Sequence, residues 1–362
     1  MLMQGIEAWI ALDLMDSIGS RSITKLLDIY HTPESILSAK VQEIKDLGIL
    51  NKAQIASLAA GPDEKKIAEV IRILHSLDAY AIGMDDALYP RLLKDIADPP
   101  VVLFCKGSIA SIEPAIAVVG TRAPSHYGKE QAYTISRDLS RKGVRIVSGL
   151  ARGIDTQAHT GALEGIGATI AVLGSGLDVI YPPENAPLAD QIAQTGAIIT
   201  EFPPGTNPDA RNFPRRNRIL SGLSAGTIVI EATLRSGAMI TARLASEQGR
   251  LVMALPGSVI NARTQGPHQL IRQGATLIQS ADDALEEIAP QVKTLLDTPV
   301  QLSEQHDEIV DLISTDPLSI EEIAQALGKD IQEITTRVSM LELAGTVTRL
   351  EGNRFSPRRS NG

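Results

Sequence analysis

The feature that most constrains the fold is an alternation, between about residues 81 and 290, of short β-branched runs with helical patterns. Parallel strands joined by crossover helices give such a pattern, because each connection must carry a helix across one face of the sheet. We therefore predict an α/β fold with a doubly wound, mostly parallel sheet. The predicted strands are Val101–Cys105, Ala115–Val119, Val144–Val147, Thr169–Leu173, Ala197–Thr200, Thr227–Ile230, Leu251–Ala254 and Thr276–Ile278.

Glycine-rich loops follow most of these strands. In an open α/β sheet the carboxyl ends of the strands line one crevice, where glycine lets the backbone approach a ligand and helix N-termini direct amides at its negative charge. We therefore expect the loops to converge on one anion site. They are Gly120–Arg122, Ser148–Gly153, Gly174–Gly176, Glu201–Gly205 and Pro256–Ser258.

A dense arginine cluster, Arg215, Arg216 and Arg218, lies just before an apolar helical pattern. Pro214 suits the first turn of a helix, since the amide hydrogen that it lacks would be unpaired there, so the arginines are expected beside free backbone amides. Residues 211–272 hold nine arginines, two glutamates and no lysine, a net charge of +7 in a chain whose total is −9. A solvated charged turn is the alternative interpretation; the charge of the window favours an anion site.

The residues before the α/β region, 1–80, are predicted to form a helical domain of helix-hairpin-helix or SAM-like type, because apolar residues recur there at helical spacing. The turn at Gly19 is similar to half of a helix-hairpin-helix, whose backbone amides approach a phosphate. Residues 1–84 nevertheless carry a net charge of −3, which favours packing or partner docking over DNA contact. The predicted helices are Ala8–Met15, Ser22–Tyr30, Pro33–Ala39, Val41–Leu47, Asn51–Ala59 and Glu64–Leu77.

The residues after the α/β region are predicted to form a linker at 291–303, a winged helix at 304–356 and a tail at 357–362. A winged helix commonly binds duplex DNA through its third helix. Here that helix holds one basic residue, Arg337, and residues 301–362 have a net charge of −5, so we expect protein docking or a structural role rather than a duplex-binding regulator. The predicted elements are helices Glu304–Ser314, Ser319–Leu327 and Ile331–Leu343 and a hairpin at 345–355.

Composition and cysteine count narrow the class of protein. The single cysteine, Cys105, lies in an apolar run, so neither a disulfide framework nor a cysteine zinc site is expected. No apolar run approaches the roughly eighteen residues of a membrane span. Met1–Trp9 contains Glu7 and no basic residue, unlike a secretory signal. We therefore expect a cytoplasmic protein without membrane insertion.

The loops lack the motifs of common nucleotide-hydrolysing and covalent catalysts. Gly174–Val179 lacks the third glycine of a dinucleotide fingerprint, and the Gly-Lys pair at Gly128 is followed by Glu130 where a Walker A loop requires Ser or Thr. Asp155 and His159 lie four apart on a predicted helix. We interpret Asp155 as a helix cap, because two ligands without a third do not make a zinc site. Neither a metal nor a cofactor is predicted.

With those chemistries excluded, the feature left to explain is a predicted groove lined by arginines. Arg122 follows one predicted strand, and Arg152 lies in the next loop. Guanidinium groups pair bidentately with phosphate oxygens, and several of them suit a repeating phosphate chain. Aromatic residues make up only 3% of the chain, which disfavours an extended stacking platform, although Tyr127, Tyr181 and Phe213 lie in or beside the loops and can each stack a base. The groove is therefore expected to hold a few nucleotides.

Together these motifs resemble the DprA/Smf family, the DNA processing protein A of bacteria. That resemblance implies an extended Rossmann-like domain, flanked by a helical N-terminal domain and a C-terminal winged helix. The matching segments span about residues 115–275 in the order of the family. They are Val119–Arg122, Ser148–Asp155, Gly174–Asp178, Tyr181-Pro182, Glu201–Gly205, Asn212–Arg218, Glu231-Ala232, Ser236–Ala238 and Pro256–Ser258.

The resemblance also implies a function and a site. It implies a homodimer that binds single-stranded DNA, helps to load RecA onto it in natural transformation and homologous recombination, and is not an enzyme. No short motif identifies the residues of the RecA or dimer contacts. The DNA-binding residues implied are Gly120, Arg122, Arg152, Gly174, Ser175, Gly176, Phe213, Arg215, Arg216, Asn217, Arg218, Ser236, Gly237 and Thr241.

An enzyme is the alternative. The same sheet pattern resembles that of nucleoside-monophosphate phosphoribohydrolases, which place an arginine and a glutamate beside a Pro-Gly-Gly phosphate loop. Gly226–Glu231 matches the end of that loop motif and Arg218 is the candidate arginine, but Gly222–Ala225 stands where Pro-Gly-Gly would cradle the phosphate.

Overall fold

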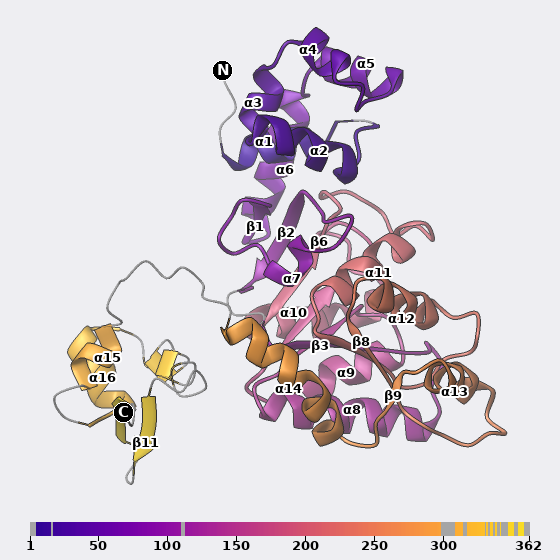
Figure 1. Ribbon diagram of the computed structural model, residues 1–362, viewed down its shortest axis with the longest axis vertical. Helices are drawn as coiled ribbons and strands as arrows, with labels where there is room; N and C mark the ends of the chain where they lie inside the picture. The colour runs from indigo at the N-terminus through magenta and orange to yellow at the C-terminus, as the bar shows by residue number, and fades with distance from the viewer. Residues whose placement is uncertain are drawn as a thin grey trace. The chain divides into compact units, whose positions relative to one another are not determined.

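The computed structural model separates into two compact units, Met1–Val292 and Lys293–Gly362, each with its own apolar core (Figure 1). The residues that it describes are 5–15, 17–109, 113–297, 308–313, 317–329, 331, 334–335, 337–338, 341, 347–350 and 354–357.

A nine-stranded mixed sheet forms the centre of the first unit, in the order β1-β2-β6-β5-β4-β3-β7-β8-β9. Neighbouring strands from β6 to β9 are parallel, whereas β1 pairs antiparallel with β2, and β2 antiparallel with β6. The α/β class and the mostly parallel sheet are thus confirmed. The strands are β1 (Ala79–Gly83), β2 (Val102–Gly107), β3 (Ala115–Val119), β4 (Arg145–Ser148), β5 (Thr169–Val172), β6 (Ala197–Thr200), β7 (Gly226–Val229), β8 (Leu251–Ala254) and β9 (Thr276–Leu277).

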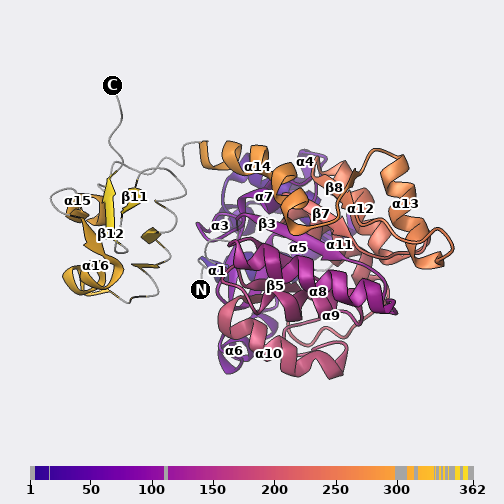
Figure 2. The same cartoon turned by 90° about the horizontal axis from the view of Figure 1, so that it is seen from below.

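Helices cover both faces of this sheet, as the side chains of β3 show. Ile116 and Val118 point into one buried cluster, and Ala115, Ala117 and Val119 into another, because successive strand residues face opposite sides. Helices α8, α9 and α14 pack on the first face, and α11 and α12 on the second (Figure 2). Their bounds are α8 (His126–Arg141), α9 (Ile154–Ala162), α11 (Asn212–Gly222), α12 (Gly237–Glu247) and α14 (Ala281–Asp297).

Six helices precede the sheet, and two of them, α1 and α6, pack against its edge strand β1 (Figure 1). At their contact the indole of Trp9 lies against Gly83, where an added Cβ would be 2.5 Å from the ring. The sequence predicted these helices but not β1. The helices are α1 (Ile6–Asp13), α2 (Ser20–Tyr30), α3 (Pro33–Ser38), α4 (Val41–Asp46), α5 (Lys52–Ala60) and α6 (Glu64–Ser76).

The second unit has a small core that includes Ile309, Ile323, Val338 and Phe355. Its three-stranded sheet has the order β10-β12-β11, and the short strand β10 was not predicted. Most of the third predicted helix, Ile331–Leu343, falls outside the described residues. The elements are α15 (Glu308–Ile313), β10 (Leu318–Ser319), α16 (Ile320–Leu327), β11 (Val347–Leu350) and β12 (Arg354–Pro357).

Two further features bear on the sequence predictions. Helix α14 continues to Asp297, so the first residues of the segment expected to be a linker are helical. No helix in the described ranges has both the length and the apolar character needed to cross a membrane.

Candidate nucleic-acid interface

Two adjoining hollows lie at the carboxyl ends of the parallel strands, and both are lined by Arg122, Tyr181 and Phe213. We call the two together the groove. Its first hollow is also lined by Gly149, Ala151, Arg152 and Pro182. Its second is also lined by Pro208, Ala210, Pro214, Asn217, Gly237 and Ile240.

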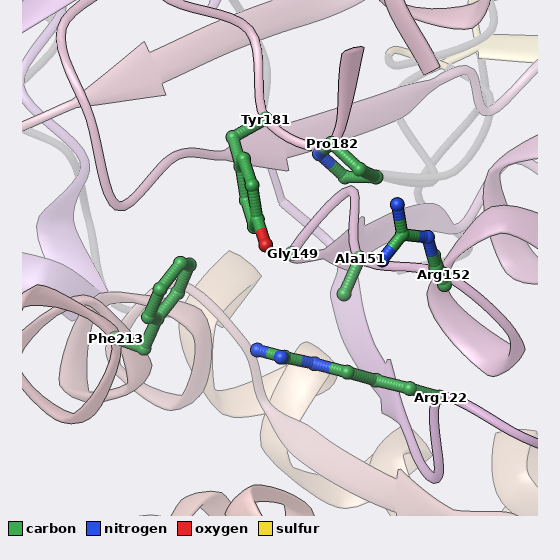
Figure 3. Close-up of a pocket in the computed structure, with 7 residues that line it drawn as sticks. All are labelled: Arg122, Gly149, Ala151, Arg152, Tyr181, Pro182 and Phe213. Carbon is green, nitrogen blue, oxygen red and sulfur yellow. The ribbon is translucent and has the colours of Figure 1, made fainter. Parts of the chain in front are cut away.

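The shared part of the groove combines a cation with two aromatic rings. The Arg122 guanidinium carbon lies 5.3 Å from the centre of the Phe213 ring, within cation–π range. The Tyr181 ring centre is 6.0 Å from that of Phe213, with the rings inclined at 48°. In Figure 3 the guanidinium of Arg122 and the hydroxyl of Tyr181 point toward the space between these side chains. This arrangement offers both a charge for phosphate and ring faces for a base.

Arg152, at the other side of the first hollow, is already paired. Its Nε donates to Glu184, and just over half of each side chain is exposed. The pair raises the pKa of Arg152 and lowers the pKa of Glu184, chiefly through their hydrogen bond. Because exposed pairs of this kind contribute little net energy, a phosphate can replace Glu184 at small cost.

The arginine cluster on α11 divides between solvent and interior. Arg215 is 61% exposed; its Nη2 is 3.3 Å from Glu201, and its guanidinium lies 5.2 Å from the centre of the Phe202 ring. Arg218, one helical turn later, is 10% exposed. It donates to Glu201 at 2.5 Å, and its Nε is 3.6 Å from Asp98. Arg215 can therefore reach a ligand, whereas Arg218 is held by carboxylates.

Arg216 lies on the opposite side of α11 and is buried. Its Nη1 donates to the carbonyl of Val172, at the end of β5, at 2.5 Å. Burial lowers its pKa to about 10, against the opposing effect of Asp155, so it keeps its charge at neutral pH. Arg216 thus lies beneath the groove, and neither it nor Arg218 lines either hollow.

The predicted residues around α12 form the far end of the second hollow. The carbonyl of Gly237 accepts from Asn217 Nδ2 and from Thr241 Oγ1, each at 3.3 Å. Asn217 and Gly237 line the hollow, while Thr241 is buried. Ser236 precedes the helix, and its buried hydroxyl has no hydrogen-bond partner within the described chain.

The glycines of the predicted loops make room for protein side chains. An added Cβ would be 2.5 Å from Ile154 at Gly120, 2.0 Å from Arg216 at Gly149, and 3.0 Å from Phe213 at Gly174. Near Gly174, the Ser175 hydroxyl donates to the Val179 carbonyl, and a Cβ at Gly176 would meet Asp178. Of these glycines only Gly149 lines the groove. At the other positions glycine is needed because a neighbouring protein side chain fills the space, and not, as predicted, because the backbone approaches a ligand.

The prediction that Asp155 caps a helix is wrong. Helix α9 begins at Ile154 and has no side-chain cap; instead Asp155 accepts from the amides of Gly149 and Ala151, 3.1 and 3.3 Å away in the preceding loop. His159 is buried against Thr169, 2.8 Å from its hydroxyl, and burial lowers its pKa to about 3. Among the described residues no group of three or more potential ligands could hold a metal ion.

The enzyme interpretation finds little support in the same geometry. Glu231 is fully buried, and its carboxylate accepts from the amide and hydroxyl of Ser125 at 2.8 and 2.5 Å. Arg218 is paired with Glu201. Neither Glu231 nor Arg218 lines the groove, so the two do not form a reaction centre there.

Some lining residues were not among the predicted site residues. Ala151 and Pro182 lie within predicted segments, whereas Pro208, Ala210 and Ile240 carry no charge and no aromatic ring, and only their position after a parallel strand or at the start of a helix could have indicated them. The prediction that all five loops converge on one site is wrong for three of them, because Gly174–Gly176, Glu201–Gly205 and Pro256–Ser258 line neither hollow.

The model of a family described as DNA recombination-mediator protein A matches residues 80–289, and the DprA winged helix domain matches residues 294–353. The chain belongs to this family. Protein Smf of Escherichia coli is 40% identical to it over 307 residues, which cover 82% of each chain.

Two solved structures of family members are similar to this one. DNA processing protein A of Streptococcus pneumoniae is 35% identical, with a TM-score of 0.71, covering 79% of this chain and 99% of its own. The Helicobacter pylori protein, described as having a single-stranded DNA binding mode, is 30% identical with a TM-score of 0.54. That match covers 59% of this chain and 96% of the other. The predicted extended Rossmann-like and winged-helix domains are therefore confirmed.

Proposed function

We propose that this recombination-mediator protein binds single-stranded DNA in the groove. The observation that carries the proposal is the position of Arg122 between Phe213 and Arg152, with Tyr181 opposite, at the shared part of the two hollows (Figure 3). Phosphates pair with the exposed guanidinium groups, and a base stacks on an aromatic ring. The single-stranded DNA binding described for the Helicobacter pylori relative supports this proposal.

The ring positions favour single-stranded over duplex DNA. Tyr181 and Phe213 present their rings inside hollows, where a base must leave its stack to reach them. In a single strand that costs little, whereas in a duplex pairing and stacking must both be broken.

The predicted site residues take different parts in this proposal. Arg122 and Arg152 contact phosphates in the groove, and Phe213 stacks a base. Arg215, which is exposed but lines neither hollow, contacts a phosphate outside the groove. The remaining residues shape or border the groove, or hold α11 and α12 in place: Gly120, Gly174, Ser175, Gly176, Arg216, Asn217, Arg218, Ser236, Gly237 and Thr241.

Arg122→Ala and Phe213→Ala test the proposal. We expect Arg122→Ala to lower the slope of log affinity against log salt by roughly one unit, since one phosphate contact is lost. Phe213→Ala is expected to weaken binding by roughly five- to a hundred-fold at constant slope, because base stacking contributes about 1–3 kcal/mol. The measurement is fluorescence anisotropy of labelled single-stranded and duplex oligonucleotides across a salt series.

Exposed Arg72→Ala on α6, in the helical domain, is the control and is expected to bind as the wild type does. A wild type that binds no single strand, or groove variants that bind it equally well, would disprove the proposal. Release of free base from a nucleoside monophosphate would then be the next measurement.

The finer parts of the function follow from family resemblance. We propose that the protein acts without catalysis, as a cytoplasmic homodimer that helps load RecA onto the bound strand. Assembly of RecA filaments on strands covered by single-strand binding protein, with and without this protein, tests the loading step. Sedimentation velocity tests the dimer.

A further inference from the structure

Beside the groove, three loops at the same edge of the sheet are tied together. They follow β3, β7 and β8 and comprise residues 120–125, 232–236 and 256–264. Arg263 Nε donates to the Ala123 carbonyl at 2.7 Å, and the Ala232 amide donates to the Arg263 carbonyl at 2.6 Å. Since Ala123 adjoins Arg122, the surface of these loops continues directly from the groove.

A buried carboxylate holds the three loops in register. Glu231, at the end of β7, accepts from Ser125 in the first loop and, at 3.4 Å, from Asn261 Nδ2 in the third. Its own carbonyl accepts from the Thr121 amide at 2.7 Å. These hydrogen bonds fix the three loops relative to one another, so that they form one surface rather than three independent segments.

This surface exposes large apolar side chains. Val259 is 83% exposed, Ile260 93% and Leu234 50%. Tyr127, at the start of α8, is 42% exposed and donates to the Pro256 carbonyl at 3.2 Å. Neighbouring exposed apolar groups of this size mark an interaction site more often than a bare surface.

The charge of the surface indicates what it contacts. The three loops contain Arg122, Arg235 and Arg263 and no aspartate, glutamate or lysine. In the part of the chain that the structure describes, neither Arg235 nor Arg263 forms an ion pair with a carboxylate. Uncompensated guanidinium groups among exposed apolar side chains suit a ligand with a polyanionic backbone and apolar faces, which is the chemistry of an unpaired strand.

We infer that these three loops form a second contact surface for the strand that leaves the groove past Arg122. Bases lie on Val259 and Ile260, and phosphates pair with Arg235 and Arg263. This inference rests on the proposed function, since it extends the same single-stranded ligand beyond the two hollows. Continuity with Arg122 and the absence of acidic residues favour this ligand over a protein partner.

The double variant Val259→Ser plus Ile260→Ser tests the inference. Binding is measured by anisotropy with thymidine oligomers of about six nucleotides, which the groove alone holds, and of about twenty nucleotides, which also cover the loops. We expect the double variant to bind the long oligomer about ten-fold more weakly and the short oligomer as the wild type does. Arg235→Ala is expected to lower the salt slope by about one unit for the long oligomer alone.

Ile166→Ser provides a matched control, because Ile166 is 85% exposed in the loop between α9 and β5, at the amino ends of the parallel strands, whereas the three loops lie at their carboxyl ends. It is expected to leave both affinities unchanged. Thermal unfolding establishes that every variant is folded.

Equal loss for the two oligomers, or the same loss in Ile166→Ser, would overturn the inference. So would unchanged binding of the long oligomer, including the case in which the double variant changes only self-association. If the wild type binds neither oligomer, the proposed function itself fails. If it binds both and the loop variants match it, only the second surface is lost.

Discussion

At the scale of single residues, neighbouring arginines of one cluster have different surroundings. Arg215 and Arg218 are three residues apart and share Glu201, yet their side chains are 61% and 10% exposed. Arg216, between them, faces the end of β5. Exposure and partner, rather than residue type, therefore decide which guanidinium can meet a phosphate.

Arg218→Ala is expected to lower the free energy of unfolding by about 3 kcal/mol, because it leaves the buried carboxylate of Glu201 without its closest partner. Arg211→Ala is the matched comparison on the same helix start. Arg211 is 89% exposed and pairs with Asp209 in solvent, so its loss is expected to leave the free energy of unfolding nearly unchanged. Urea unfolding measures both, and equal midpoints for the two variants would contradict this assignment.

The sequence predicts the arginine cluster, but it does not predict which of the arginine side chains are exposed and which are buried. Helical periodicity places Arg215 and Arg218 on one side of α11 and Arg216 on another. Which side faces water depends on Glu201 and Asp98. Glu201 lies in a predicted loop, but nothing in its motif indicates that its carboxylate pairs with these arginines, and Asp98 lies far away in the chain and carries no motif. For the same reason Arg122 and Phe213 were predicted separately, while their stacking could only be seen in three dimensions.

At the scale of elements, the groove depends on close contact between the loop after β4 and helix α11. Gly149 in that loop leaves the space that the Arg216 guanidinium occupies. Asp155, on α9, accepts from the amides of the same loop. One buried arginine and one buried carboxylate thus hold loop and helices together beneath the first hollow.

Gly149→Ala is expected to lower the free energy of unfolding by about 2 kcal/mol. The new Cβ would lie 2.0 Å from Arg216 Nη1 and displace it from the Val172 carbonyl, which costs a hydrogen bond to a charged group. Gly237→Ala, whose Cβ would meet nothing within 4 Å, is the control for stability. Equal unfolding free energies for Gly149→Ala and wild type would show that the loop moves to accommodate the new Cβ without loss of stability.

Element prediction was accurate where burial made the pattern continuous. The central strands β3 and β6 have the predicted bounds, since strands covered on both faces read as unbroken apolar runs. Strand β1 was not predicted. It is five residues long and pairs antiparallel at an edge of the sheet, and its sequence gives no pattern that distinguishes it from the preceding helix. The Asp155 cap was wrong, because the acidic residue stands inside the first turn and its partners lie in the loop before it.

At the scale of the whole first unit, the N-terminal helices are joined to the base of α11 through polar groups. Ser20 donates to Asp98, and Arg21 lies 4.0 Å from the same carboxylate, which also contacts Arg218. Asp13, at the end of α1, is close enough to Glu201 for its titration to be affected. The helical domain and the groove therefore share one electrostatic network.

Asp13 gives the unfolding free energy a dependence on pH. Burial, with the charge of Glu201, raises its pKa to about 7, against the effects of Arg215 and Arg218. The folded protein therefore binds the Asp13 proton more tightly than the unfolded chain does. The contribution of this tighter binding to the free energy of unfolding is fully present below pH 4 and is lost as the pH rises to about 7.

Asp13→Asn, which keeps the neutral shape, is expected to gain stability over the wild type progressively between pH 4 and pH 7 and to keep a constant advantage above pH 7. Thermal unfolding at each pH measures the difference. Asp28→Asn, at an exposed position of α2, controls for the change in net charge. A difference that does not vary with pH would show that Asp13 is ionised throughout.

The pairing of arginines with distant carboxylates changes how the molecule meets a polyanion. Along the chain, residues 211–272 carry a net charge of +7. In space, Asp98, Glu201 and Asp209 come from outside that window and neutralise part of it. These three carboxylates lower the net charge of the window from +7 to +4, and beyond the Debye length of about 10 Å at 0.1 M salt that remainder is largely screened. Capture of a passing strand therefore depends mainly on local contacts in the groove, and long-range attraction adds to it at low salt.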